Sequence, residues 1–284
     1  MRIALASIVL GLVTAGCVPD QTASSPDYAP YSTDGGLQPL TCLPNLDGQI
    51  DADEMVPALG VTENLLASPL GQTRPVDLVG TVNAMGQQIW DWSTPDATDQ
   101  LAHLTATTLS GKWYASSFPN GQFVTPIDLA DTLEGVYVHT ATDFELLGIA
   151  STQKNASDGE TLVVYDTPVQ LYRYPLKAGD SWTSVGVSRN AMLKGLSYAG
   201  TDTYEIAVDD AGILYLPSLT FTQAFRVQMT TTVAPAAGES AVTRQDSFLA
   251  ECFGEIARAT SQTNETQDNF TTAAEIRRLG LAGD

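Results

Sequence analysis

Apolar and polar side chains alternate along much of the chain after residue 62, with turn-forming residues between the runs. In the clearest run, 219–233, Leu, Phe, Val and Met side chains occupy one face, and the other face is rich in Thr. Successive side chains of a β-strand point to opposite faces, so this run predicts a strand with one face on a core and the other toward water. The other predicted strands are 76–82, 88–92, 104–116, 135–139, 144–151, 161–165, 169–174, 181–188, 244–253, 255–261 and 270–279.

Turn residues divide these runs. Residues 204–208 alternate, Asp209-Asp210-Ala211-Gly212 follow, and 213–216 are again apolar and aromatic, which predicts a hairpin. Segments 155–159 and 190–195 are the expected exposed loops. No long helical period follows residue 66, so residues 62–284 are predicted to be mainly β, as an antiparallel β-sandwich or a strongly curved barrel-like sheet.

The start of the chain has the pattern of a secretory signal peptide over residues 1–16. A basic start with Arg2 precedes an apolar run, 3–13, and three small residues. That run is far shorter than the roughly 20 residues of a membrane-spanning helix. The sequence Val-Thr-Ala-Gly-Cys ending at Cys17 resembles the lipobox of bacterial lipoproteins.

The lipobox resemblance implies cleavage before Cys17 and attachment of acyl chains such as palmitate to that cysteine. Val18, rather than Asp, follows the cysteine, which is similar to lipoproteins exported to the outer membrane. Acyl chains hold a protein at a membrane without a spanning helix. The expected location is therefore the cell envelope, by a lipid anchor and at the outer membrane, with the membrane as a partner.

Residues 17–41 are rich in Pro, Ser, Thr, Asp and Gly and have no apolar period, which predicts a flexible linker. Two cysteines remain beyond Cys17, at Cys42 and Cys252. In an oxidising compartment an even pair is most simply one disulfide. The alternative is two buried free thiols.

An acidic segment, 42–60, follows the linker, and its residues 43–54 resemble an EF-hand loop. Gly48 stands at the sharp turn, and oxygen-bearing side chains stand at the third, fifth, ninth and twelfth positions. Hard oxygen ligands around a Gly turn are what calcium requires. Leu43 occupies the first position, so the resemblance implies weak calcium binding. The alternative is an acidic turn that caps a short helix over 52–59. The predicted calcium ligands are Asn45, Asp47, Asp51 and Glu54.

The composition restricts the possible functions. The chain has 33 acidic and 13 basic residues and a formal net charge of -20, which disfavours nucleic acid as a partner. It contains only two histidines, His103 and His139, and we expect both to be ordinary strand residues. No Gly-x-Ser-x-Gly or phosphate-binding Gly-x-x-x-x-Gly-Lys string is present, so no catalytic residue and no nucleotide cofactor are predicted.

The segment 175–182, with its Lys-Ala-Gly-Asp-Ser-Trp sequence, and the later runs 219–229 and 248–256 resemble uncharacterised cell-envelope β-proteins. In that group a tight turn places a Trp in the core and the later strands pair as a meander. The resemblance implies no specific activity.

The sequence therefore predicts an extracytoplasmic lipoprotein with a structural or binding role, not an enzyme. One alternative is a carrier of lipid or a small apolar ligand, with a cavity in the curved sheet. A second is a carbohydrate-active or hydrolytic envelope enzyme, for which acids near two tryptophans are the candidates. The candidate cavity residues are Tyr172, Tyr174, Trp182 and Tyr198. The candidate sugar-binding cluster is Trp90, Asp91, Trp92, Asp96 and Asp99.

Overall fold

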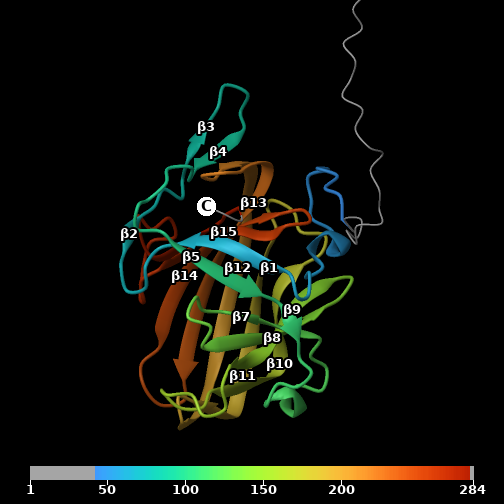
Figure 1. Ribbon diagram of the computed structural model, residues 1–284, viewed down its shortest axis with the longest axis vertical. Coiled ribbons are helices and arrows are strands. Elements are labelled where there is room, and N and C mark those ends of the chain that lie inside the picture. The colour runs from blue at the N-terminus through green and yellow to red at the C-terminus, as the bar shows by residue number, and fades with distance from the viewer. Residues whose placement is uncertain (1–41, 282–284) are drawn as a thin grey trace, which may run out of the picture. The chain divides into compact units, whose positions relative to one another are not determined.

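The computed structural model describes residues 42–281 (Figure 1). The predicted signal peptide, Cys17 and the linker up to residue 41 lie outside the described residues. Within the described part, sixteen strands form one sheet, and helix is confined to short 3-10 turns. The prediction of a mainly β, barrel-like body is confirmed, and a two-sheet sandwich is not formed.

Two 3-10 turns and sixteen strands follow one another along the described part of the chain. They are η2 (Ala52–Met55), β1 (Thr62–Ala67), β2 (Arg74–Pro75), β3 (Thr81–Val82), β4 (Gln88–Asp91), β5 (Gln100–Thr105), β6 (Thr107–Thr108), η3 (Ala115–Ser117), β7 (Phe123–Pro126), β8 (Leu133–His139), β9 (Asp143–Ser151), β10 (Leu162–Arg173), β11 (Ser181–Leu193), β12 (Leu196–Tyr215), β13 (Thr220–Pro235), β14 (Ala241–Ala250), β15 (Gly254–Ser261) and β16 (Thr272–Leu279).

The strands from β6 to β16 form an antiparallel meander, in which each strand pairs with the next along the chain. β16 then pairs with β1, and β1 pairs with β5, so β5 and β6 lie at opposite ends of the strand order. Only Ala106 separates these two strands in the sequence. The sheet must therefore curl until its two edges meet, and β1 and β5 cross in front of the long strands β12–β14 in Figure 1.

The hairpin predicted at 209–212 is wrong, because β12 continues through these residues to Tyr215. Its pairing with β13 shifts register at two places, between Val208 and Asp210 and between Gly212 and Leu214. β-Bulges of this kind absorb extra residues without ending a strand. The last residues of β12 also pair with β4 in parallel, which is the exception to the antiparallel pattern.

Three other predicted elements have different boundaries in the structure. The helix expected over 52–59 is a single 3-10 turn, η2, which ends before Pro57. The strand expected over 104–116 breaks after Thr105 where the chain crosses between the sheet edges. The loop expected at 190–195 is reduced to a tight turn at Lys194 and Gly195, because β11 continues to Leu193.

The two faces of the sheet have different surroundings. Apolar side chains of β9–β14 form the largest cluster on the inner face, and it includes Trp182, Ile206 and Phe225. A second cluster on the opposite face of β13–β16 is covered by the segment 76–92, through Trp90 and Trp92. The outer face of the last strands is therefore buried as well as the inner face.

Tyrosine rings lie directly over glycines of the inner face. A Cβ atom on Gly186 would lie 2.6 Å from the Tyr165 ring, and one on Gly135 would lie 2.3 Å from the Tyr137 hydroxyl oxygen. Real Cβ atoms do not approach other atoms this closely. These glycines therefore leave room for the tyrosine side chains to pack closely against the strands.

We expect Gly186→Ala to lower the free energy of unfolding by about 1 to 3 kcal/mol, because the added methyl group overpacks the space under Tyr165. Denaturant unfolding followed by tryptophan fluorescence measures this change. The matched control is Val185→Ala, which lies on the same strand and is 41% exposed. Equal losses in the two variants would contradict the close-packing explanation.

Candidate functional site

The segment 42–56, which we call the cap segment, packs against the inner apolar cluster. Ile50 is completely buried in that cluster and exchanges two backbone hydrogen bonds with Leu176, each of 2.9 Å. Ala52 and Met55 pack against the same cluster. The cap segment is therefore part of the folded body.

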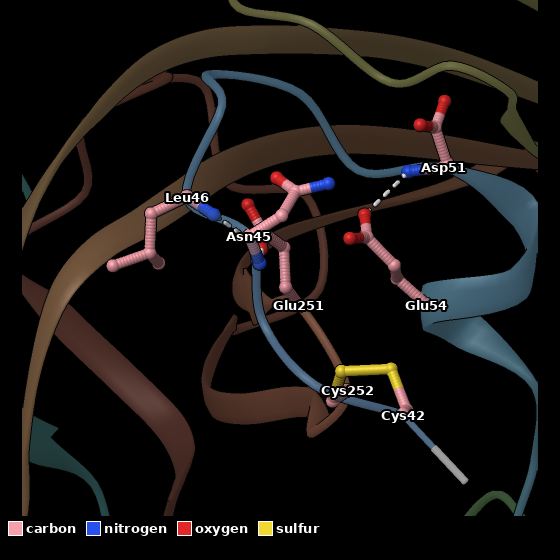
Figure 2. The surroundings of a disulfide bond; sticks show 7 residues. All are labelled: Cys42, Asn45, Leu46, Asp51, Glu54, Glu251 and Cys252. Atoms are coloured by element: carbon pink, nitrogen blue, oxygen red, sulfur yellow. Dashed lines mark hydrogen bonds between the residues drawn. A yellow bond between two sulfur atoms is a disulfide. The ribbon is translucent and has the colours of Figure 1, made fainter.

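The predicted cysteine pair is confirmed: Cys42 and Cys252 are joined by a disulfide, with Cα atoms 5.5 Å apart (Figure 2). Cys252 lies in the turn between β14 and β15 and has a positive φ of 66°. Its backbone N–H donates to the Glu54 carbonyl oxygen at 2.8 Å. The disulfide thus fixes the start of the cap segment to this turn.

The side chains predicted to bind calcium are involved in turns and capping contacts. The Asn45 side-chain oxygen accepts a hydrogen bond from the Asp47 N–H at 2.8 Å. The Glu54 carboxylate accepts one from the Asp51 N–H at 2.9 Å, as in a capping box (Figure 2). Within residues 42–281, no three His, Cys, Asp or Glu side chains are grouped so that they could hold a metal ion. Weak calcium binding stays a prediction.

Sequence reasoning did not identify Glu251, the residue before Cys252, as part of this loop. One oxygen of its buried carboxylate accepts hydrogen bonds from the backbone N–H groups of Asn45 and Leu46, at 2.7 and 2.8 Å (Figure 2). Burial raises the pKa of Glu54, and the nearby Glu251 carboxylate also raises it, against the lowering effect of the Asp51 N–H. Glu251 therefore anchors the acidic loop to the body.

Charged side chains gather on the inner face of β15, β16 and β1, close to this turn. We call Glu63, Glu255, Arg258 and Arg277 the inner charged cluster. Arg258 and Arg277 are register partners on adjacent strands. On β16, the neighbouring Arg278 points to the opposite face, where it donates to the Trp92 carbonyl oxygen at 2.7 Å.

Glu255 joins the two arginines. One of its carboxylate oxygens accepts hydrogen bonds from Arg277 at 2.7 and 3.0 Å. The other accepts from Arg258 at 2.6 and 2.9 Å and from the Ser247 hydroxyl at 2.8 Å. Both oxygens are thus fully used in holding the guanidinium groups.

The electrostatics of the inner charged cluster reflect this arrangement. Burial by itself raises the pKa of Glu255, but Arg258 and Arg277 outweigh that effect and lower the pKa to about 2. The protein that surrounds Glu63 raises its pKa although the side chain is exposed to solvent, and the Glu255 carboxylate adds to the increase. Glu255 is therefore the permanent anion, and Glu63 takes up a proton more readily than an ordinary glutamate.

The inner charged cluster remains accessible to solvent although it lies on the inner face. The side chains of Glu255 and Arg258 retain 18% and 20% of their exposure. Glu63 is exposed, while Leu65 and Ala67, which follow it on the same face of β1, are buried. Solvent therefore reaches the inner face at this place.

Aromatic side chains of β7–β10 form the neighbouring part of the inner face. We call Phe123, Tyr137, Phe144 and Tyr172 the aromatic wall. Phe123 stacks on Tyr137 with ring centroids 5.5 Å apart, and Phe144 lies 5.6 Å from Tyr172. Burial raises the pKa of Tyr137 to about 12, while Arg258 and Arg277 act to lower it.

The predicted cavity residues lie together on the inner face. Tyr172, Tyr174 and Trp182 belong to the inner apolar cluster, and Tyr198 packs against it. Trp182 also follows the tight turn at Gly179, as the resemblance to envelope β-proteins implied. Sequence reasoning therefore found the apolar side of the site but not its charged side.

The tryptophans of the predicted sugar-binding cluster are core residues. Trp90 and Trp92 are 1% and 7% exposed, and their indole N–H groups donate to the carbonyl oxygens of Leu78 and Asp77. Neither ring is open for stacking on a sugar. Asp99 forms ion pairs with Arg74 and Arg278.

The two histidines lie apart from each other. The exposed His103 contacts the Asn64 side chain at 2.8 Å on the outer face of β5. His139 packs beside Phe144 and Tyr174, and burial lowers its pKa. Both lie on strands, and Nε2 of His139 is buried without a hydrogen-bond partner.

Two hollows lie on the outer surface. A groove of about 340 Å³ crosses β11–β14 and is lined in part by Glu205, Arg244 and Asp268. A second hollow of about 240 Å³ lies beside Trp92, Asp96 and Arg278. Neither contains the inner charged cluster.

The fold and the inner face define a nearly closed, single-sheet β-protein with an aromatic wall beside an accessible charged cluster. Protein-family models gave no match to this chain. Searches of curated proteins and of solved structures likewise found no significant match. Among the described helices, none is both long enough and apolar enough to span a membrane.

We expect Glu255→Gln to lose a pH-dependent contribution to stability. A carboxyl group whose pKa is lower in the folded state stabilises the fold above its unfolded pKa, near 4.5, and this contribution disappears as the pH falls through about 2. The shift corresponds to a contribution on the order of 3 kcal/mol. Wild type and variant should therefore differ most in unfolding free energy above pH 5 and converge toward pH 2.

Denaturant unfolding at a series of pH values measures this difference. The matched control is Glu239→Gln, because Glu239 is exposed in the turn between β13 and β14. The control should follow wild type at every pH. A difference between wild type and Glu255→Gln that is constant across the pH range would contradict the role assigned to the two arginines.

Proposed function

We propose that this chain is a lipid-anchored protein of the cell envelope whose barrel-like body binds a small ligand on its inner face. The inner face supports the binding role, because it carries both an aromatic wall and a charged cluster whose side chains retain some exposure to solvent. Ligand sites typically combine an apolar lining with a few placed polar groups. The sequence predicted a structural or a binding role, and this proposal adopts the binding role. It includes the alternative that the protein carries a lipid or a small apolar ligand.

The lipobox-like sequence ending at Cys17 supports the anchor and the envelope location. The disulfide between Cys42 and Cys252 is consistent with an oxidising compartment outside the cytoplasm. An anchored body of this kind would act at the membrane surface, where amphipathic molecules are abundant. The lipid anchor and the ligand site are tested by separate experiments.

Metabolic labelling with palmitate tests the anchor. The wild-type chain, expressed in a Gram-negative host, should incorporate label and fractionate with membranes, because Cys17 carries the acyl chains. Cys17→Ala should incorporate none. Cys42→Ala is the control for cysteine loss and should label like wild type. Equal labelling of wild type and Cys17→Ala would remove the anchor from the proposal.

A neutral fluorescent probe tests the ligand site. N-phenyl-1-naphthylamine, whose emission rises in apolar surroundings, should bind the full chain. Ala102→Trp, which places a bulky ring on the inner face of β5 beside Leu65, should weaken that binding about tenfold or more, because the ring fills accessible space.

Leu101→Trp is the matched control, because Leu101 lies on the outer face of the same strand and is 44% exposed. It should bind the probe like wild type. Binding that is absent in the wild type, or that weakens equally in both variants, would contradict an inner ligand site.

A further inference from the structure

We propose that the body docks on a lipid surface of zwitterionic head groups through the end of the sheet that carries the Cys42–Cys252 disulfide. The contact is made by three exposed apolar side chains around this disulfide, Leu43, Leu46 and Phe253, which we call the disulfide patch. This inference rests on the lipid anchor of the proposed function and names the surface that the anchored body contacts. It does not depend on the ligand site of the inner face.

Covalent and hydrogen bonds bring the three side chains of the disulfide patch together. Leu43 and Phe253 each follow one of the two bonded cysteines, whose Cα atoms lie 5.5 Å apart. The Leu46 N–H donates at 2.8 Å to the carboxylate of Glu251, which belongs to the same turn as the second cysteine. The Phe253 ring also packs against Phe221, with ring centroids 5.2 Å apart. The patch is therefore held in place on the turn between β14 and β15.

The side chains of the disulfide patch expose apolar surface to water. Leu43, Leu46 and Phe253 are 74%, 53% and 51% exposed. Figure 2 shows the Leu46 side chain directed away from the carboxylates of Asp51 and Glu54. Single exposed apolar side chains are normal, but several that are gathered and held in place mark a surface that contacts a membrane or another protein. Leucine and phenylalanine are suited to the boundary between head groups and acyl chains.

The chain that precedes the patch favours a membrane as the partner. Cys17, the residue predicted to carry the acyl chains, stands 25 positions before Cys42 in the sequence. A chain of that length spans at most about 80 to 90 Å, so the anchor keeps Cys42 within that distance of the lipid. The patch begins at the next residue and meets the membrane at a high effective concentration, at which a weak contact suffices for docking.

The same end of the sheet carries a second group of exposed apolar side chains. β4 pairs with the last residues of β12, which pair with the first residues of β13, near the end of β14 that leads into the disulfide turn. The hairpin of β3 and β4 therefore stands at this end, and it lies at the top of Figure 1. Its exposed side chains are Val79, Val82 and Met85. A lipid surface that contacts the disulfide patch thus lies on the side of the body that carries this hairpin.

The charges around the patch determine the kind of lipid. The segment 42–61 contains no Lys or Arg, and Asp47, next to Leu46, is exposed. Anionic lipid attracts basic segments, so it finds no opposite charge in this segment and repels Asp47. The formal net charge of -20 on the whole chain adds to the repulsion. Zwitterionic head groups exert no such repulsion, so the burial of apolar surface drives the contact.

Fluorescence quenching by a labelled lipid tests the docking. The full chain with Phe253→Trp as a reporter is lipidated in a Gram-negative host and reconstituted into phosphatidylcholine vesicles. Some of the phosphatidylcholine carries a doxyl group near the top of one acyl chain, which quenches a tryptophan at the lipid boundary. The emission that Phe253→Trp adds to that of wild type should be quenched severalfold more strongly than the emission that Leu196→Trp adds. Leu196 is the matched control, because it is 73% exposed at the opposite end of β12.

Substitutions test whether the patch makes the contact. In the Phe253→Trp background, Leu43→Ser with Leu46→Ser should reduce the quenching severalfold, because the patch loses its other apolar side chains. Leu196→Ser in the same background should leave the quenching unchanged. A circular dichroism spectrum that matches wild type confirms that each variant is folded.

The lipid composition tests the role of charge. Addition of phosphatidylglycerol to the vesicles should reduce the quenching of Phe253→Trp, because the anionic head groups repel the acidic segment beside the patch. Equal or stronger quenching on these vesicles would contradict the preference for zwitterionic lipid.

Flotation of the vesicles separates this inference from the proposed function. If wild type floats with the vesicles but Phe253→Trp is quenched no more than Leu196→Trp, or if the serine pair leaves the quenching unchanged, the docking surface is wrong and the anchor remains. If Phe253→Trp is unquenched and the detergent-solubilised wild type sediments as a dimer that the serine pair dissociates, a second copy of the chain occupies the patch and lipid docking is overturned. If wild type does not float, both the inference and the proposed anchor are overturned.

Discussion

The closure of the sheet at Ala106 is the constraint on which the other features depend. The chain passes from β5, at one end of the strand order, to β6, at the other end, through this single residue. The Gly60 N–H donates to the Ala106 carbonyl oxygen at 2.8 Å and holds the crossing in place. Because one residue spans only a few ångströms, the two edges must lie side by side. Closure creates an inner face and leaves little unpaired edge on which another chain could add a strand.

The inner charged cluster is costly in such an interior. Removing an ion from water costs on the order of several kcal/mol, and a buried ion pair often adds no net stability over an apolar replacement. Arg258 and Arg277 are register partners, so their like charges would also repel each other without Glu255. Glu255 compensates both costs by accepting hydrogen bonds from both guanidinium groups. The two arginines therefore depend on Glu255 for their place in the interior.

The sequence predicted the apolar half of this structure and missed the charged half. The alternation over 219–233 corresponds to β13, and the segments around Tyr172 and Trp182 lie on the inner face as expected for a curved sheet. Residues 209–212 have the composition of a turn, which by local preference alone would form a hairpin. They instead lie within β12, because pairing with β13 on one side and with β4 just beyond them stabilises a bulged but continuous strand. The charged cluster was missed because alternation assigns charged positions to water. In β15 and β16 the outer face is buried under the segment 76–92 and the inner face carries the charged side chains, so polarity along the strand does not distinguish inside from outside.

The Cys42–Cys252 disulfide, predicted because two cysteines remain once Cys17 is assigned to a lipid anchor, joins the start of the described chain to the sheet. Everything before Cys42 joins the body at a residue that is covalently fixed to the turn between β14 and β15, three residues from Glu255. A force on the preceding chain therefore reaches the sheet through a covalent bond rather than through the hydrogen bonds of Ile50 and Leu176. The bond closes a loop across a sequence separation of 210 residues. In the chain-entropy model, closing such a loop lowers the entropy of the unfolded chain and thereby raises the free energy of unfolding by about 5 kcal/mol at most. The bond that joins the preceding chain to the sheet therefore also stabilises the fold, and it lies close in the sequence to Glu255 of the candidate site.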